Sequence, residues 1–385
     1  MALPHCPACE HDGARPIAEL TAVPVFCNAL WDDRDQARSA PVGDLDLVLC
    51  ERCGLLWNRS FDEALTAYSP AYENSLHFSP AFQTFARSLA EDLVQRYDLR
   101  DTSVVEIGAG SGDFLAMVCE LGGNRGIGYD PSHDPARAVP GPVEVVAEHY
   151  PVDRPIDARL VCSRHVLEHV TEPTPLLEGV RGSLDPALDT VVYLEVPDAT
   201  FMLEQPAVWD LIYEHCTYFS EATLNALCTR AGFKTLRSGR SFGDQYLWVE
   251  AGAGKPRIEY PSAEEIAALV AAADGFGAHL RSMIVDWDQR LDRMAQDGPV
   301  AVWGAGSKGV SFLSLIARPE AVGHVVDVNP HKAGNFLPAS GLQVQTPDAL
   351  PEDLAHVLVM NPIYLDEITG SVRDLGLDAQ VTPVA

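Results

Sequence analysis

Apolar residues recur in short runs between residues 100 and 250, and polar, helix-forming segments separate these runs. Such runs are typical of buried strands, and their alternation with helices predicts a parallel, doubly wound sheet. In open sheets of this kind, ligands bind beside the carboxyl ends of the strands. We therefore expect a site at the ends of the strands predicted at 104–107, 125–129, 144–146, 158–163, 190–196 and 245–250.

Helical periodicity marks both flanks of this region. Phe82, Phe85, Leu89 and Leu93 share one face of a predicted helix. A longer helix is predicted over 262–296, and a second, smaller α/β unit begins at Pro299. The pattern predicts four parts: a module at 1–65, a main α/β domain at 66–260, a linking helix at 261–296 and a Rossmann-like domain at 297–385.

The charge of the chain limits its partners. The 385 residues carry a net charge of −28, which argues against a nonspecific nucleic-acid binder and against docking on anionic lipid. No apolar run approaches the roughly 20 residues that span a bilayer. The first residues lack the basic start and apolar core of a secretory signal. We expect a cytoplasmic protein that acts on a small molecule.

The sequence E-I-G-A-G-S-G, from Glu106 to Gly112, joins the first predicted strand to a helix. Glycine allows unusual backbone dihedrals and a close approach of a ligand. The next strand ends at Asp130, and an acid in this position can accept hydrogen bonds from a ribose diol. The pair predicts a nucleoside cofactor. The turn resembles motif I of class I S-adenosylmethionine (SAM) methyltransferases, whereas a dinucleotide site expects GxGxxG, with its third glycine one position later.

Two CxxC pairs lie 40 residues apart near the N-terminus. Each pair can supply two thiolates to one tetrahedral zinc ion, and a site with four thiolates would be closed and structural. A redox CxxC would be expected to open a thioredoxin-like βαβ unit, which neither pair does. We predict Zn²⁺ bound by Cys6, Cys9, Cys50 and Cys53.

Four polar clusters are candidates for acceptor chemistry. His165 and His169 follow the fourth strand and flank Glu168; pocket lining, helix capping and a metal pair are all compatible with this spacing. Glu214 and His215 stand among aromatic residues, and a histidine beside a carboxylate can act as a base near neutral pH. The other clusters are a bridging loop with Tyr68, Tyr72 and His77, and a later turn, Gly304 to Gly309, followed by Asp327. That turn could hold NAD, hold the nucleotide portion of a substrate, or be structural.

The order of these motifs resembles the sugar C-methyltransferases of antibiotic deoxysugar pathways. Its most specific part is W-G-A-G-S-K-G followed by D-V-N-P-H-K-A-G-N-F-L-P. The resemblance covers essentially the full chain. It implies an N-terminal zinc-binding module, a class I SAM methyltransferase Rossmann-like core and a C-terminal Rossmann-like domain. It also implies a nucleotide-linked 4-keto sugar as acceptor, methylated on carbon through an enolate.

The resemblance also assigns residues. Glu106, Gly108, Gly110 and Asp130 would bind SAM, and we add Gly112 and His165 to this set. The expected catalytic residues are His215 as the leading candidate for the base, Glu214, His169 and Tyr72. Two alternatives stay open: methylation of oxygen or nitrogen in another natural-product intermediate, and a zinc- and nucleotide-binding module without catalysis.

Overall fold

The computed structural model describes residues 3–66, 73–136, 138–205 and 207–384. A seven-stranded sheet forms its centre, in the order β6-β5-β4-β7-β8-β11-β10. Its strands are β4 (Ser103–Ile107), β5 (Arg125–Tyr129), β6 (Val143–Val146), β7 (Leu160–Arg164), β8 (Val191–Pro197), β10 (Phe233–Ser241) and β11 (Tyr246–Ala253). The first five are mutually parallel, as the alternation of strands and helices predicts.

The last two strands depart from the prediction of a parallel sheet. The run at 245–250 does form a strand, β11, but it pairs antiparallel with both β8 and β10. Only a short turn separates β10 from β11, and a connection of this length can join antiparallel strands but not parallel ones. β10 was not predicted, because all its residues after the buried Phe233 are exposed or half-buried and show no apolar run.

Helices cover both faces of this sheet. α2 (Pro80–Arg96) and α3 (Asp113–Gly122) pack on one face, and α4 (Pro173–Ser183) and α6 (Glu221–Arg230) on the other. Neighbouring strand residues divide between the two cores: Val104 packs with α2 and α3, whereas Val105 packs with α4 and α6. This is the alternation that a strand imposes on its side chains. α5 (Ala199–Glu204) follows β8.

The N-terminal module contains an antiparallel sheet of four strands, in the order β1-β2-β3-β9. β1 (Ala14–Pro24), β2 (Val42–Cys50) and β3 (Leu56–Asn58) belong to the module, and α1 (Arg34–Arg38) lies between the first two. The fourth strand, β9 (Thr217–Tyr218), comes from the middle of the chain and pairs with β3. The segment of Glu214 and His215 is therefore fixed against the module at one end.

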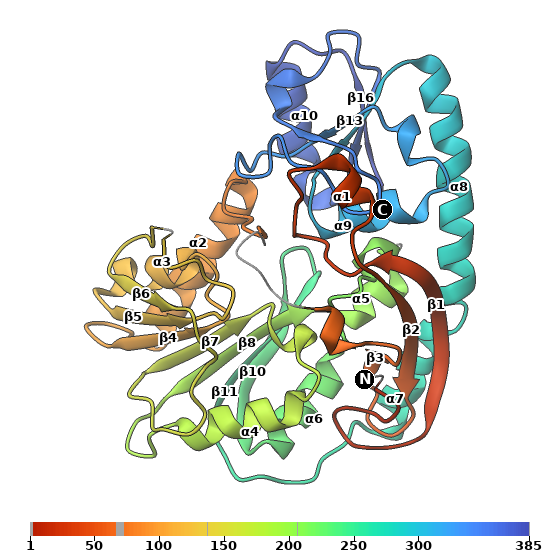
Figure 1. Cartoon of the computed structure of the whole chain (residues 1–385). Helices are drawn as coiled ribbons and strands as arrows, with labels where there is room; N and C mark the ends of the chain where they lie inside the picture. Colours follow the sequence, from red (N-terminus) through yellow and green to blue (C-terminus); the bar gives the residue numbers. More distant parts are fainter. Residues whose placement is uncertain (1–2, 67–72, 137, 206, 385) are drawn as a thin grey trace.

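The C-terminal unit is a five-stranded parallel sheet in the order β14-β13-β12-β15-β16. Its elements are β12 (Val300–Trp303), β13 (His324–Val326), β14 (Val344–Gln345), β15 (His356–Val359), β16 (Gln380–Pro383), α9 (Ser307–Leu315) and α10 (Leu365–Asp374). Figure 1 places this unit above the central sheet, with α1 against it. The late glycine turn follows β12, in the middle of this sheet.

Two helices link the lower and upper parts of the molecule, where the sequence predicts one. α7 (Ala263–Ala273) ends before Asp274, and α8 (Phe276–Asp297) follows Gly275, whose φ of 85° interrupts the helix. Figure 1 shows α8 running along one side up to the C-terminal unit. No helix in the described part of the chain is long and apolar enough to span a membrane.

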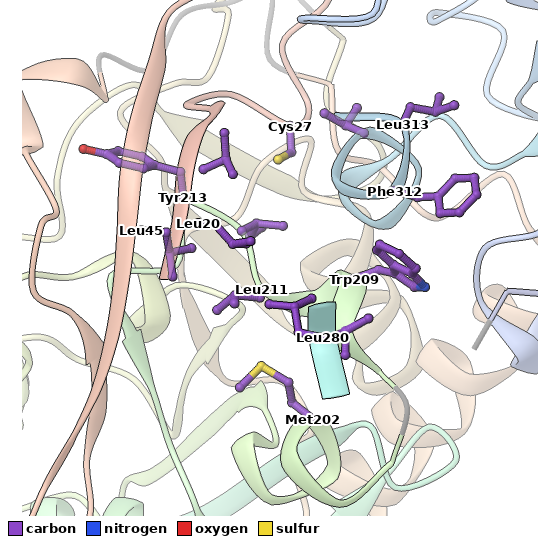
Figure 2. Packing of buried hydrophobic residues seen from close by; sticks show 14 of the residues in the cluster. Leu20, Cys27, Leu45, Met202, Trp209, Leu211, Tyr213, Leu280, Phe312 and Leu313 are labelled. Atoms are coloured by element: carbon purple, nitrogen blue, oxygen red, sulfur yellow. The ribbon is translucent and has the colours of Figure 1, made fainter. Parts of the chain in front are cut away.

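One hydrophobic core joins the three parts. Figure 2 shows side chains of this core, which come from β1 and the segment after it, β2, the 199–213 segment, α8 and α9; the labelled residues are Leu20, Cys27, Leu45, Met202, Trp209, Leu211, Tyr213, Leu280, Phe312 and Leu313. Because these side chains pack in one cluster, the parts hold a fixed arrangement around the site. The domain boundaries given above remain predictions.

Candidate active site

The turn after β4 leaves room for a ligand at one glycine and not at another. All three glycines have positive φ: 72° at Gly108, 55° at Gly110 and 81° at Gly112. A Cβ on Gly108 would lie 2.1 Å from Val166 Cγ2, but a Cβ on Gly110 would meet no atom within 4 Å. Gly108 and Gly110 line a cavity, whereas Gly112 precedes α3 and does not. The open side of Gly110 is therefore where a ligand can approach the backbone.

Asp130 lies beside this turn. Its Oδ2 accepts the backbone N–H of Gly110 at 2.8 Å, and its Oδ1 accepts the N–H of Ser132 at 2.8 Å and its hydroxyl at 2.6 Å. A carboxylate has about four acceptor sites, so Asp130 retains capacity for a ribose hydroxyl. Glu106 lies deeper, and burial raises its pKa to about 8.

A single cavity of about 1380 Å³ extends from this turn to the C-terminal unit. Its middle is lined by His165, Glu168, His169 and His215, and its far end by the turn from Gly304 to Gly309 together with Asp327 and Lys332. Two glycine turns, one from each α/β unit, thus border the same space. The volume is ample for two small molecules that must react with each other.

Buried ionised groups lie behind the middle of the cavity. Arg164, the last residue of β7, donates from Nε to Glu195 Oε1 at 2.8 Å, and a second guanidinium nitrogen lies 2.8 Å from the same oxygen. The next residue, His165, has a left-handed φ of 55°. Its Nε2 lies 3.5 Å from Glu195 Oε1 and its Nδ1 lies 3.5 Å from Glu168 Oε1. Burial alone would lower the pKa of His165, but the two carboxylates raise it to about 9.

His169 and His215 face each other across the same region. Their ring centroids are 5.0 Å apart, and His169 Nδ1 lies 2.9 Å from the carbonyl oxygen of Glu214, to which it donates when protonated there. Burial, followed by the nearby His169, lowers the pKa of His215 to about 3. His215 is therefore neutral at ordinary pH and has a free lone pair, but the burial that keeps the ring neutral also opposes its protonation.

Glu214 points in a different direction from its neighbour. Its Oε2 accepts the backbone N–H of Cys27 at 2.7 Å, its side chain is buried, and it is absent from the residues that line the cavity. The carboxylate thus attaches the segment of His215 to the N-terminal module. The predicted catalytic residue Tyr72, and Tyr68 with it, lie outside the described residues.

The second glycine turn repeats the arrangement of the first. The backbone N–H of Ala305 donates to Asp327 Oδ2 at 2.8 Å, just as Gly110 donates to Asp130. Lys308 forms an ion pair of 2.5 Å with Asp210, and the buried Lys332 donates to the carbonyl of Ala305 at 3.1 Å. Two ammonium groups therefore stand beside this turn, each held by partners on the protein.

The four predicted zinc ligands of the N-terminal module come together in one cluster. All are buried, and their sulfur atoms lie within 4.8 Å of one another. The Cys6–Cys53 and Cys9–Cys50 sulfur pairs are each 3.5 Å apart. A disulfide requires about 2.05 Å, whereas ligands at about 2.3 Å from a tetrahedral zinc lie roughly 3.8 Å apart. The residues fit one zinc ion.

Comparisons with known proteins identify the family of this chain. A methyltransferase domain family matches residues 82–238, and a C-methyltransferase C-terminal domain family matches residues 254–377. The C-methyltransferase NovU of Streptomyces niveus is 24% identical over 364 residues, which span 89% of this chain and 86% of the relative. The chain is a SAM-dependent methyltransferase. The resemblance to the sugar C-methyltransferase family is confirmed, and the central sheet is the class I methyltransferase core.

Solved structures also resemble part of this methyltransferase. One is the 1,6-didemethyltoxoflavin-N1-methyltransferase of Burkholderia thailandensis with S-adenosylhomocysteine, at 21% identity and a TM-score of 0.36, covering 46% of this chain and 82% of that one. Another is the magnesium protoporphyrin IX methyltransferase of Synechocystis, at 15% identity and a TM-score of 0.35, covering 45% and 84%.

Sequence reasoning about the methyltransferase missed a network rather than a single residue. Glu195, Arg164 and Glu168 are all buried, and their partners come from β7, β8 and the short helix Leu167–His169. The run R-H-V-L-E-H carries three of the four ionisable groups of this network, Arg164, His165 and Glu168, and it was the available signal. The predicted cofactor contact His165 turns both ring nitrogens toward carboxylates and belongs to this network. Lys332 was also missed, although it lies in the D-V-N-P-H-K segment.

Proposed function

We propose that the enzyme methylates a carbon atom next to the ketone of a nucleotide-linked keto-deoxysugar. The observation that carries this proposal is the single cavity: it connects the glycine turn after β4, His215 and the glycine turn after β12. A base placed between two nucleotide-sized subsites suits an acceptor that is activated by proton removal and anchored by a nucleotide. The sugar of the acceptor would then lie in the middle of the cavity.

The subsite at the first turn suits SAM, which supplies a methyl group activated by a sulfonium. Gly110 offers an uncovered backbone, and Asp130 offers acceptor sites for a ribose hydroxyl. Glu106, at the end of β4, adds a buried carboxyl group near the turn. These residues would fix the donor so that its methyl group faces His215 and the acceptor.

The subsite at the second turn suits the diphosphate of a nucleotide. The first turn of α9 presents backbone N–H groups there, and a helix N-terminus favours an anion. Lys308 and Lys332 add positive charge close by. Lys308 is paired with Asp210, and Lys332 Nζ lies 3.4 Å from Asp327 Oδ2. Because each lysine already has an aspartate partner, the two would contribute by positioning the anion rather than as free cations.

His215 is the proposed base. It lines the cavity and is neutral, so a ring nitrogen can take the proton from the carbon next to the ketone, and the electron pair of the broken C–H bond remains as an enolate. The ring of His169 lies 5.0 Å from that of His215; with its Nδ1–H on the carbonyl of Glu214, it could donate from Nε2 to the enolate oxygen as an imidazolium. We propose Glu214 as a positioning group for this segment; the role of Tyr72 remains a prediction.

The zinc site belongs to the same proposal. Cys6, Cys9, Cys50 and Cys53 would hold a closed structural Zn²⁺, and Thr223 Oγ1 donates to the carbonyl of Cys53 at 3.2 Å. This contact joins the metal site to α6 of the methyltransferase core. The metal would thus stabilise the interface of the two parts and take no part in methyl transfer.

The test uses the purified enzyme with methyl-labelled SAM and a nucleoside-diphosphate-linked 4-keto-6-deoxyhexose. We expect a product with a new carbon-bound methyl group by NMR. His215→Gln should lower turnover by about 10²- to 10⁴-fold and leave SAM affinity within about twofold. His279→Gln, on the exposed side of α8, is the matched control and should behave as wild type. Methylation on oxygen or nitrogen, or SAM binding without transfer to any ketosugar, would overturn the proposal.

A further inference from the structure

Glu168 is a buried carboxylate whose place in the fold calls for an explanation. It lies in the short helix Leu167–His169, is 2% exposed and lines the cavity. Within the described part of the chain, neither of its oxygens has a hydrogen-bond partner; the imidazole of His165, at 3.5 Å, is only an ion-pair neighbour. Burying a carboxylate without hydrogen bonds is costly, and the ion pair with His165 offsets only part of that cost. A protein retains such a group where a positive charge arises during function.

The proposed base lies close to this carboxylate. A carboxylate oxygen of Glu168, a ring nitrogen of His169 and a ring nitrogen of His215 all lie within 4.8 Å of one another. His169 uses its Nδ1 on the carbonyl of Glu214, which fixes that ring in place. His215 Nδ1 is buried and has no hydrogen-bond partner among the described residues. When His215 becomes protonated, Glu168 therefore offers a carboxylate within a few ångströms of the new charge.

The other groups around His215 do not stabilise a positive charge on its ring. His169 and His165 are imidazoles, Lys308 is an ammonium paired with Asp210, and the ring of Tyr218 lies 5.9 Å away. Among the charged groups that act most strongly on His215, Glu168 is the acid. The effect is reciprocal: burial raises the pKa of Glu168, but His165, His169 and His215 together lower it below the ordinary value.

We propose that Glu168 is a positioning residue that stabilises His215 once this ring has taken the proton from the acceptor carbon. The inference rests on the proposed function of His215. In the step concerned, the C–H bond next to the ketone breaks, the proton moves to a ring nitrogen of His215, and the electron pair stays on the acceptor as the enolate. The His215 imidazolium then faces the Glu168 carboxylate, whose negative charge now stabilises the positive charges of both His165 and His215.

The network behind Glu168 explains why its charge is maintained. Arg164, Glu195, His165 and Glu168 form a chain of alternating charge, in which each neighbour is within 3.5 Å. Arg164 holds the pKa of Glu195 down to about 2, against the effect of burial. Because His165 is protonated between the two carboxylates, Glu168 is held as an anion before any substrate proton arrives.

The experiment isolates proton removal from methyl transfer. The enzyme is incubated with S-adenosylhomocysteine, in place of SAM, and with a nucleoside-diphosphate-linked 4-keto-6-deoxyhexose deuterated at the carbon next to the ketone. Loss of deuterium to water then reports the base alone. Glu168→Gln keeps the shape and removes the charge; we expect about 10²-fold slower deuterium loss, with the SAM dissociation constant and the acceptor KM within about twofold. Under turnover with SAM, the deuterium isotope effect on kcat should increase.

Two further variants complete the test. Glu168→Asp keeps a charge on a shorter side chain and should retain more activity than Glu168→Gln. Glu172→Gln removes an exposed carboxylate four residues further along and should match wild type. Glu168 has no such role if the substrate loses deuterium with Glu168→Gln as fast as with wild type. The same conclusion follows if Glu168→Asp and Glu168→Gln lose activity to the same extent and both also lose thermal stability. If the wild-type enzyme exchanges no deuterium, the proposed function itself fails.

Discussion

Two of the three glycines in the turn after β4, Gly108 and Gly110, allow effects on ligand binding to be separated from effects on folding, because the same substitution acts differently at each. Gly108→Ala would bring a Cβ to 2.1 Å from Val166 Cγ2 at a φ of 72°, whereas Gly110→Ala would place a Cβ in open space at a φ of 55°. Gly376→Ala is the matched control: its φ is 75°, it also has open space around it, and it does not line the cavity.

The expected magnitudes follow from these contacts. A left-handed backbone costs an alanine roughly 1–2 kcal/mol, so Gly110→Ala and Gly376→Ala should lower the free energy of unfolding by about this amount. Gly108→Ala adds an overpacking cost of roughly 1–3 kcal/mol and should be the least stable of the three. In Gly110→Ala the same kind of overlap arises only when SAM is bound, and roughly 1–3 kcal/mol corresponds to about a 5- to 150-fold loss of affinity.

Calorimetric titration with S-adenosylhomocysteine and thermal unfolding without ligand measure the two quantities separately. We expect Gly110→Ala to resemble Gly376→Ala in stability and to differ from it in affinity. If Gly110→Ala binds S-adenosylhomocysteine as tightly as Gly376→Ala does, the cofactor does not approach the backbone at Gly110. The assignment of the first subsite would then be wrong, even though the fold would stand.

Further predictions concern the metal and the buried carboxyl group. Metal analysis should find about one zinc per chain, and Cys50→Ala should lose it and unfold at a lower temperature; a wild-type protein without metal would contradict the site. Burial raises the pKa of Glu106 to about 8 from its ordinary value of 4.5, so the folded state holds a proton that the unfolded chain releases. The contribution of Glu106 to the free energy of unfolding should therefore fall as the pH rises from 4.5 to 8, by about 1.4 kcal/mol per pH unit. The free energy of unfolding of wild type minus that of Glu106→Gln, measured by denaturant titration across this window, should decrease; a constant difference would refute the assignment.

Much of the central sheet could be predicted, because its parallel strands are buried on both faces and read as continuous apolar runs. β5 begins and ends at the residues predicted, 125 and 129. β14 and β16 were missed for a different reason from β10: they are short edge strands with few buried side chains. The break at Gly275 was missed as well, because one glycine in a long helical pattern is usually tolerated.

The polar part of the site shows where sequence reasoning stops. The positions of Gly110 and Asp130 follow from strand ends, which the apolar pattern locates. Glu214 and His215 are adjacent in sequence, but one binds the backbone of Cys27 and the other lines the cavity. This division depends on β9, a two-residue strand that pairs with the N-terminal module. Contacts between segments that are distant in sequence decide it, and no local pattern records them.

The same long-range pairing links the parts of the enzyme to its chemistry. His215 is fixed on one side by β9, which the N-terminal module holds, and His169 is attached to the same segment through the carbonyl of Glu214. Lys308, from the C-terminal unit, pairs with Asp210 just ahead of that segment. All three parts of the chain therefore bear on a stretch of about ten residues, 210–218. The proposed base, which would remove a carbon-bound proton, needs such restraint, because a displacement of about 1 Å can cost roughly 10²-fold in rate. The N-terminal module and the C-terminal unit supply this restraint from opposite ends.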